Sequence, residues 1–359
     1  MAKFVCPYCI HQYSKNKIKY FCPDCNQDSK RGFLEPEPVK CKNPQCGKLA
    51  TKRICPKCGE EITKSILETK NLPFSIVGVS TSGKTNYITV MLNELMQASD
   101  LALSAETHDT QVHQEKMYDS IYIQHRPPGS TDTSEITAQI WSVKNLKKKH
   151  GSKIPTYTFT IFDGAGERLE NLSTDSVECR YINASKAIIL LLDPLILQGL
   201  DLDRQAMLNS LNGGNITIKN SVNVVNSVAA YIKQARGIHS DQLLDIPVAV
   251  VLSKFDMVWN HSAFPSNPVV KHESMMLQDG VFNESEMYEV DAQIRSWLER
   301  IGEAKFIKAL TSNFREFYFF GVSSYGSAPK SSYQLPDEIK PHRVLDPILW
   351  LFHREKFID

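Results

Sequence analysis

The sequence predicts an α/β fold with a mainly parallel β-sheet, preceded by two small zinc ribbons. Three observations lead to this prediction. Short apolar runs recur along residues 73–359, and several end in glycine or small polar residues. This pattern is typical of buried parallel strands whose carboxyl ends form a ligand-binding site. The first of these runs opens directly into a glycine-rich loop and a helical segment. Eight of the nine cysteines fall within the first 70 residues, in closely spaced pairs.

Length and charge limit the classes of protein to consider. A chain of 359 residues suffices for two or three domains, or for one large core with appendages. The net charge of +1 hides an asymmetry, because residues 1–70 hold 14 Lys+Arg against 7 Asp+Glu and the remainder is acidic. No apolar run approaches the roughly 20 residues of a membrane span, and the N-terminus lacks the apolar region of a signal peptide. We therefore expect a cytoplasmic protein.

The chain divides into four segments by composition. We expect one zinc ribbon over residues 1–35, a second over 36–62, a linker over 63–72 and the large domain, with helical insertions, over 73–359. Residues 62–71 indicate a short helix or tether that ends at Pro73. Residues 222–236 read as an amphipathic helix in one insertion.

The paired cysteines predict two structural zinc sites. A C-x-x-C turn points two thiolates at one tetrahedral metal, and a second turn completes the shell. In a cytosolic protein this spacing favours Zn²⁺ over disulfides. Gly47 and Gly59 each follow a cysteine, at a position where a positive φ lets the backbone turn away from the metal. The simpler grouping is sequential, and an interleaved cross-brace is the alternative. The sequential groups are Cys6, Cys9, Cys22 and Cys25, then Cys41, Cys46, Cys55 and Cys58.

The N-terminal region is basic, which bears on its partner. A zinc ion bound by four thiolates carries a formal negative charge. Two such centres therefore reduce the positive net charge of residues 1–70 without cancelling it. The basic residues could form a patch that suits a nucleic-acid phosphate backbone. Docking to a protein, which we favour, and a purely structural role are the other interpretations. The basic residues are Lys15, Lys17, Lys19, Lys30 and Arg31, near Tyr13, Tyr20 and Phe33.

Residues 74–85 contain the motif Gly78-x-x-x-x-Gly83-Lys84-Thr85 between a β-type run and a helical segment. The two glycines let the loop wrap closely, so that backbone N–H groups point at phosphates, and the helix adds its positive N-terminal end. Lys84 would reach the β- and γ-phosphates, and the Thr85 hydroxyl would hold Mg²⁺. The motif therefore predicts a nucleoside triphosphate site.

A second run, residues 157–163, ends in Asp163-x-x-Gly166. An aspartate there would hold Mg²⁺, and the N–H of the glycine would meet the γ-phosphate. Between the two motifs lies a Gly/Pro-flanked polar stretch with the composition of a loop that orders on binding. Thr131 is our first candidate there to close over Mg²⁺, and Thr133 is the second.

Two further runs lie downstream and bear on the base. The run over 246–252 leads into Ser253-Lys254-Phe255-Asp256. The carboxylate of Asp256 would accept two hydrogen bonds from N1–H and the 2-amino group of guanine, which adenine cannot offer. The Lys254 stem would cover the base face. The run over 317–321 ends near Ser323 and Ser324, where a backbone N–H would meet the guanine carbonyl.

In this order, the motifs resemble the five sequence boxes of Ras-like GTPases of the translation-factor-related class. The resemblance covers residues 72–330. The segment Tyr181–Pro194 looks like that of bacterial double-GTPase domains found in conflict and anti-phage systems. The resemblance implies a GTP-binding and GTP-hydrolysing switch that uses Mg²⁺. Glu167 stands where relatives have a water-orienting glutamine, so slow hydrolysis is expected unless a partner or an arginine, Arg168 or Arg180, assists.

The resemblance also implies the site residues. Catalytic roles fall to Glu167, Thr131 and Lys84, and Mg²⁺ ligands to Thr85, Thr131 and Asp163. Nucleotide contacts fall to Gly78, Ser80, Thr81, Ser82, Gly83, Lys84, Thr85, Asn86, Gly166, Ser253, Lys254, Asp256, Ser323 and Ser324. Two other functions stay open at this point. One is a nucleic-acid-associated NTPase whose ribbons hold RNA or DNA, and the other is a GTP-binding protein that does not hydrolyse GTP.

Overall fold

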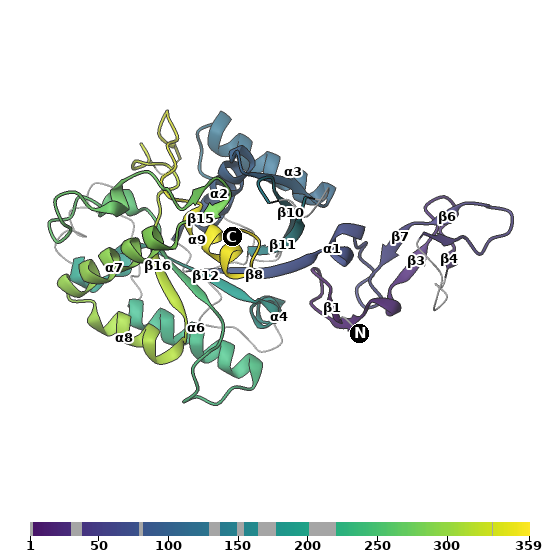
Figure 1. Ribbon diagram of the computed structural model, residues 1–359, viewed down its shortest axis with the longest axis horizontal. Coiled ribbons are helices and arrows are strands. Elements are labelled where there is room, and N and C mark those ends of the chain that lie inside the picture. The colour runs from purple at the N-terminus through teal and green to yellow at the C-terminus, as the bar shows by residue number, and fades with distance from the viewer. Residues whose placement is uncertain are drawn as a thin grey trace.

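The computed structural model describes residues 3–29, 38–78, 82–128, 137–148, 154–163, 177–200, 220–331 and 333–359. A Cys-rich module precedes a larger α/β domain (Figure 1). Within the described ranges, no helix is both long and apolar enough to cross a membrane.

A seven-stranded sheet forms the centre of the α/β domain. Its order is β16-β13-β12-β8-β11-β10-β9. The first five strands in this order run parallel, whereas β10 is antiparallel to both β11 and β9. The prediction of a mixed α/β fold with a mainly parallel sheet is confirmed. The strands are β8 (Lys70–Gly78), β9 (Leu101–Ala105), β10 (Thr137–Asn145), β11 (Thr156–Asp163), β12 (Ala187–Leu192), β13 (Val248–Leu252) and β16 (Phe317–Gly321).

The middle strands are apolar because both faces of the sheet are covered. Every residue of β12 is buried, as is every residue of β13. Such strands read as continuous apolar runs and not as alternating ones. The predicted run at 246–252 therefore corresponds to a central strand, β13.

Helices cover both faces of the sheet. Trp350 of α9 packs against Tyr318 of β16, with ring centroids 5.3 Å apart. Phe306 of α8 packs against Phe319, the next residue of the same strand, at 6.0 Å. Because consecutive strand side chains point to opposite faces, α9 and α8 lie on opposite sides. The helices are α2 (Lys84–Gln97), α3 (His108–Tyr118), α4 (Val177–Ala184), α6 (Ser221–Arg236), α7 (Glu284–Arg300), α8 (Ala304–Asn313) and α9 (Asp346–Arg354).

Side chains fix where several helices begin. Thr107 accepts a hydrogen bond from the Thr110 N–H at the start of α3. Asn220 and Asn283 do the same at α6 and α7. Each satisfies a backbone donor that the helix itself cannot. Helix α6 confirms the amphipathic helix expected over residues 222–236.

Shorter elements complete the domain. The hairpin β14 (Leu277–Gln278) and β15 (Val281–Phe282) precedes α7. A π-helical turn (Asp119–Ile123) follows α3, and single 3-10 turns lie at Pro194–Ile196, Gln198–Leu200, Phe255–Met257 and Val269–Lys271.

The Cys-rich module is made of short strands and has a small core of its own. A three-stranded sheet has the order β4-β3-β7, and β1 pairs with β2 and β5 with β6. Its strands are β1 (Lys3–Val5), β2 (Gln12–Ser14), β3 (Lys19–Phe21), β4 (Asp28–Ser29), β5 (Val39–Lys40), β6 (Leu49–Ala50) and β7 (Lys52–Ile54), with a 3-10 turn at Lys15–Lys17.

The connection between the two parts is structured. Helix α1 (Lys64–Glu68) lies within the expected linker, and strand β8 already begins at Lys70. Lys70 pairs with Tyr157 of β11, so the central sheet starts three residues before Pro73. The module is thus joined directly to the strand that leads to the glycine-rich loop.

Candidate functional site

The predicted site segments converge on the carboxyl edge of the parallel strands. Gly78, the last residue of β8, lies opposite Leu191 of β12. Leu252, the last residue of β13, pairs with Leu192 on one side and with Gly321 on the other. Asp163, the last residue of β11, lies opposite Ile76, two residues before Gly78. Four loops that are distant in sequence therefore leave the sheet along one edge, where open α/β sheets bind ligands.

The described part of the glycine-rich loop has the geometry that its residues require. A Cβ on Gly78 would lie 2.3 Å from the carbonyl oxygen of Leu191, so only glycine fits there. Gly83 has a φ of +74° and precedes α2, a backbone conformation that glycine adopts without strain. The loop therefore turns sharply into the N-terminus of a helix of 14 residues.

Lys84 crosses back over this loop. Its side chain is buried, and its Nζ lies 3.5 Å from the carbonyl oxygen of Gly78. Ser82 is also buried, whereas Thr85 and Asn86 are half-buried at the start of α2. An amino group and the first N–H groups of a helix thus face the same region, an arrangement that suits an anionic ligand.

The segment after β13 is fixed to its neighbour by Ser253 and Lys254. The Ser253 N–H and Oγ both donate to the carbonyl oxygen of Leu192, at 2.8 and 3.1 Å. Lys254 has a φ of +48°, and its Nζ forms an ion pair with Asp193 Oδ2 at 2.7 Å. The Ser253 hydroxyl therefore donates its hydrogen bond to the last residue of strand β12.

Asp193 is a residue that the sequence reasoning missed. Its side chain is only 2% exposed, whereas that of Lys254 is 42% exposed. The buried carboxylate therefore holds the outer lysine in place across the edge of the sheet. The sequence does contain a signal for Asp193, because this aspartate directly follows a fully apolar run. A charge buried at such a position needs a partner of opposite charge.

The segment with Asp256 packs on the strand that precedes Ser323. The Phe255 N–H donates to the carbonyl oxygen of Val322 at 2.9 Å. A Cβ on Gly321 would lie 2.7 Å from the Phe255 ring, so the glycine makes room for that ring. Asp256 itself is half-buried. The two base-contacting segments that we expected from sequence are thus adjacent.

Ser323 and Ser324 lie in a turn that a second chain segment holds. The backbone of Ser323 exchanges hydrogen bonds of 3.0 and 2.8 Å with that of His342. The Ser323 Oγ accepts a further bond from the Gly326 N–H at 2.9 Å. Ser323 is buried and Ser324 half-buried. The turn is closed by its own hydrogen bonds, which fixes the direction of the loop.

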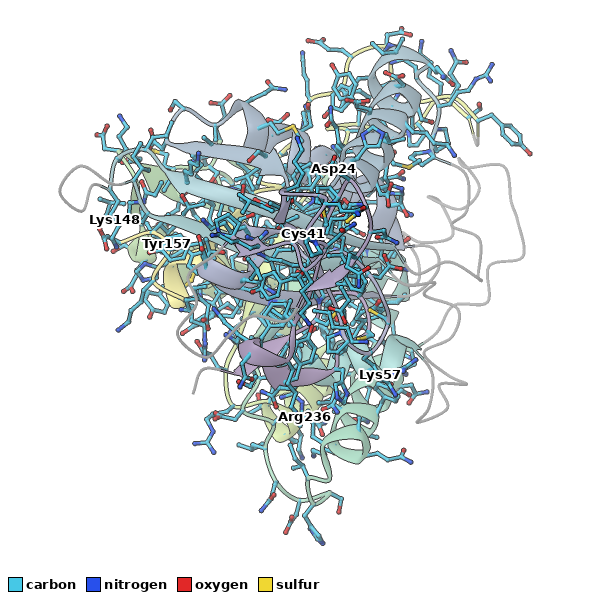
Figure 2. All side chains as sticks on the ribbon, turned by 90° about the vertical axis from the view of Figure 1, so that its right-hand side faces the viewer. Asp24, Cys41, Lys57, Lys148, Tyr157 and Arg236 are labelled. Carbon is cyan, nitrogen blue, oxygen red and sulfur yellow. The ribbon has the colours of Figure 1, made fainter. Side chains whose placement is uncertain are left out.

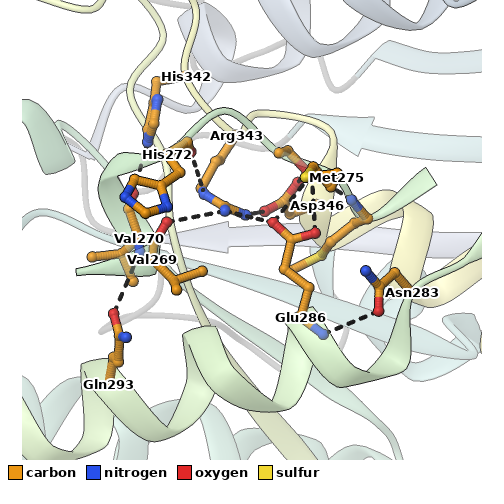
Figure 3. A network of polar contacts seen from close by, with 12 residues as sticks. Val269, Val270, His272, Met275, Asn283, Glu286, Gln293, His342, Arg343 and Asp346 are labelled. Carbon is orange, nitrogen blue, oxygen red and sulfur yellow. Dashed lines mark hydrogen bonds and ion pairs between the residues drawn. The ribbon is translucent and has the colours of Figure 1, made fainter. Parts of the chain in front are cut away.

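A buried ionic network anchors this second segment (Figure 3). The Arg343 side chain is fully buried between Asp346 and Glu286 of α7, at 2.7 and 2.6 Å. It also donates to the carbonyl oxygens of His272 and Val269. Burial raises the pKa of Asp346 to about 6, against the opposing effect of the neighbouring guanidinium. The network positions the residue next to it, His342, and through it Ser323.

The eight cysteines form two clusters whose geometry suits zinc. The Sγ atoms within each cluster all lie within 4.8 Å of one another. Close Sγ pairs are 3.8 and 3.7 Å apart in one cluster, and 3.6 and 3.5 Å in the other. Four sulfurs bound at about 2.3 Å to a tetrahedral zinc stand about 3.8 Å apart. The inner cluster is Cys6, Cys9, Cys55 and Cys58, and the outer cluster is Cys22, Cys25, Cys41 and Cys46.

The predicted sequential grouping of the cysteines is wrong, and the interleaved alternative is not found either. The clusters are nested, with the first and last pairs together and the two middle pairs together. The reason is that β3 and β7 are antiparallel, with Tyr20 opposite Arg53. Cys22 follows β3 at one end of this ribbon, and Cys55 follows β7 at the other. The clusters therefore do not follow the expected division into ribbons at residues 35 and 36.

The backbone around the cysteines supports metal binding. The Asn43 N–H points at Cys41 Sγ and the Lys57 N–H at Cys55 Sγ, both at 3.4 Å. Backbone N–H groups, that of Cys25 most strongly, lower the pKa of Cys22 to about 7, whereas burial raises the pKa of Cys6 and Cys58. Such donors favour thiolates, the form that binds zinc.

A residue with positive φ follows each of the four cysteine pairs. Gly47 and Gly59 have φ of +60° and +82°, which confirms that part of the prediction. Ile10 and Asn26 hold the equivalent positions with φ of +62° and +53°. Asparagine tolerates this conformation, whereas it is strained for a β-branched residue.

Other predicted residues lie outside the described part of the chain. They are Ser80, Thr81, Thr131, Thr133, Gly166, Glu167 and Arg168. Asp163 is described as the last residue of β11, and Arg180 is exposed on α4.

Comparison with known proteins finds no matching family model and no matching curated protein. Several solved structures are similar in part. Roco2 RocCORdC of Methanosarcina barkeri, bound to GDP, is 13% identical, with 80% of this chain and 49% of that chain covered and a TM-score of 0.28. The Ski7 GTPase-like domain of S. cerevisiae, bound to GTP, is 14% identical, with 80% and 50% covered and a TM-score of 0.34.

A third similar structure is the signal recognition particle receptor SRb-GTP/SRX complex of Chaetomium thermophilum. It is 15% identical, with 73% of this chain and 93% of that chain covered, and has a TM-score of 0.31. This chain spans about half the length of the first two matched chains, 49% and 50%. All three of these structures contain GDP or GTP.

Proposed function

We propose that the protein is a GTP-binding molecular switch with slow, Mg²⁺-dependent GTP hydrolysis. The observation that carries the proposal is the alignment of Gly78, Leu252 and Gly321 at one edge of the sheet. The start of α2 and the segments around Asp256 and Ser323 therefore lie at the same end of the sheet. One segment is suited to phosphates and the others to a base, at the switch point of an open parallel sheet.

Phosphate binding is supported by the start of α2. Lys84 turns back to the carbonyl of Gly78, so its amino group lies over the loop and not in solvent. The chemistry of a triphosphate, with about four negative charges, matches a lysine and a helix N-terminus. Mg²⁺, when bound, would neutralise phosphate oxygens. Thr85, Asp163 and Thr131, or Thr133 instead, offer the oxygen donors that this ion prefers.

Guanine preference rests on Asp256. A carboxylate there would accept from N1–H and the 2-amino group of guanine, and adenine would leave it unmatched. The ion pair between Lys254 and Asp193 holds the lysine stem beside this position. Glu167, which would repel the γ-phosphate, is our reason to expect slow turnover.

A nucleotide panel tests the proposal directly. GDP and GTP should displace a fluorescent guanine nucleotide from the full chain, and ATP should not. Lys84→Ala should abolish triphosphate binding, because the amino group over the loop is lost. Asp256→Asn should weaken GTP binding about tenfold or more and strengthen binding of xanthosine triphosphate. An unchanged base preference would remove guanine from the proposal.

Turnover needs a separate measurement. Phosphate release from GTP and Mg²⁺ by the wild-type chain should be slow but above that of Lys84→Ala. If GTP binds and no phosphate is released, the protein is the non-hydrolysing GTP-binding protein that the sequence leaves open. A role in a bacterial conflict or anti-phage system is a further proposal that rests on the sequence resemblance alone.

Basic side chains of the Cys-rich module support a second function, nucleic-acid association, as the alternative to the docking or sensing role that we favour for this module. Residues 38–57 contain six basic residues and no acidic one: Lys40, Lys42, Lys48, Lys52, Arg53 and Lys57. Four of these lysines are exposed: Lys40, Lys42, Lys48 and Lys57. Binding to single-stranded RNA or DNA that weakens steeply with salt would support this function. Salt-independent capture of a protein would instead support docking.

A further inference from the structure

A tyrosine of the α/β domain contacts a turn of the inner cysteine cluster. Tyr181 lies in α4, and its buried side chain donates a hydrogen bond from Oη to the carbonyl oxygen of Tyr8, at 2.7 Å. Tyr8 stands between Cys6 and Cys9, two members of the inner cluster. The bond therefore ends on the turn that presents two of the four sulfurs.

The same ring packs against the end of strand β11. The centroids of Tyr181 and Phe162 are 3.9 Å apart, and the rings are 22° from parallel. Phe162 is 3% exposed and immediately precedes Asp163. It lies opposite Ser75 of β8, three residues before Gly78. One side chain thus contacts both the metal-binding turn and the strand that carries a proposed Mg²⁺ ligand.

Further contacts fix this half of the module on the sheet. Ile140 of β10 is fully buried in the core of the Cys-rich module, together with Ile62 and Ile66. Glu106, the residue directly after β9, accepts hydrogen bonds from Thr63 and Ser65, the former at 3.0 Å. The inner half therefore packs as part of the domain surface.

The outer cluster has a different position. It lies at the opposite end of the β3–β7 ribbon, and Figure 1 shows β4 and β6 far from the central sheet. Figure 2 views the molecule from this side, with Cys41 of the outer cluster labelled. The two clusters share a ligand chemistry but differ in their contact with the domain.

We propose that Tyr181 is a positioning residue for the Asp163 segment, and that metal in the inner cluster, but not in the outer one, holds it in place. With metal bound, the Tyr8 carbonyl is fixed where the Tyr181 hydroxyl can reach it. Without metal, the turn is free to move, and the tyrosine loses the partner that orients its ring against Phe162. This inference rests on the proposed nucleotide function.

Three variants test separately the Tyr181 hydroxyl, the inner cluster and the outer cluster. Tyr181→Phe keeps the ring and removes only the hydroxyl. Cys55→Ser removes one inner ligand, and Cys41→Ser removes one outer ligand as the matched control. Zinc content, affinity for a non-hydrolysable GTP analogue with Mg²⁺, and hydrogen exchange of residues 157–163 are measured for each full-length chain.

We expect Tyr181→Phe to retain two zinc ions per chain and to weaken analogue binding about fivefold, the loss typical of one hydrogen bond. Cys55→Ser should weaken binding at least as much, and Cys41→Ser should leave it unchanged. Exchange of residues 157–163 should accelerate in the first two variants only. Equal effects of the inner and outer variants, or unchanged exchange of residues 157–163 in Tyr181→Phe, would overturn the inference.

The exchange readout separates this inference from the proposed function. If the wild-type chain binds no guanine nucleotide, the proposed function fails, yet the exchange of residues 157–163 still tests the positioning. If nucleotide binds and the exchange pattern is the same in all chains, the function stands and the positioning role fails.

Discussion

The two parts of the molecule are stabilised by different means. The α/β domain has a continuous apolar core, in which all of β12 and β13 is buried. The Cys-rich module has a far smaller core, to which the central sheet contributes Ile140. Burial of apolar area stabilises the first, whereas the second has two four-cysteine clusters whose geometry suits zinc. The comparison teaches that the module should depend on metal for its fold and the domain should not.

Metal removal should give the largest effect of all, and it should act on the module and, in the domain, on residues 157–163 alone. Structural zinc contributes on the order of 10 kcal/mol or more to the folding of such units. With a strong chelator, the amides of β3 and β7 should exchange rapidly, and those of β12 and β13 should stay protected. Hydrogen exchange followed by mass spectrometry checks this. Equal loss of protection in both regions would break the comparison.

In the domain, the strongest single substitution should be Arg343→Met. It leaves Asp346 and Glu286 buried without their partner, which costs about 3–5 kcal/mol. Urea unfolding followed by tryptophan fluorescence gives this value, and zinc content should not change. The matched control is Arg315→Met, whose ion pair with Asp245 is exposed and contributes about 1 kcal/mol or less. Similar losses in both variants would mean that the network of Figure 3 contributes little.

A smaller effect is expected at the packing contact beneath the proposed base site. Gly321→Ala places a Cβ 2.7 Å from the Phe255 ring and should cost about 1–3 kcal/mol. It should also weaken GDP binding, because the shifted ring carries Asp256 with it. Adding Phe255→Leu should restore part of both losses. A double variant no better than the single one would exclude this contact as the cause.

The smallest effect should be a gain, in the module. Ile10→Gly relieves a β-branched residue at a φ of +62° and should stabilise the inner cluster by about 1 kcal/mol. A slower loss of zinc to a competing chelator measures this gain. Asn26→Gly, at a φ of +53°, should change little because asparagine tolerates this conformation. If both substitutions act alike, strain at Ile10 is not the reason.

Much of the α/β domain could be predicted from the sequence, because its signals are local. The apolar runs that became β8, β11, β12, β13 and β16 are visible in the chain, as is the helix over residues 222–236. The positive φ of Gly47, Gly59 and Gly83 follows from residue type and position. The glycine-rich loop can be recognised in the sequence from its own residues alone.

The parts that could not be predicted depend on pairing between distant segments. The same four C-x-n-C turns fit a sequential, an interleaved or a nested grouping, and only the antiparallel β3–β7 ribbon decides. The partner of Lys254 is Asp193, 61 residues away, and no local pattern reveals it. The same holds for Arg343 and Glu286, which are 57 residues apart, whereas the other partner of Arg343, Asp346, is only 3 residues away.

The nested order of the cysteines has a consequence for folding during synthesis. As the chain leaves the ribosome, the outer cluster is complete once Cys46 has emerged, whereas Cys6 and Cys9 must wait for Cys58. Their contact with the domain waits longer still, until Tyr181 has been made. The turn with Cys6 and Cys9 is thus translated before its partners and is among the last segments to reach its final place, so nascent chains arrested before residue 181 should carry an incompletely anchored module.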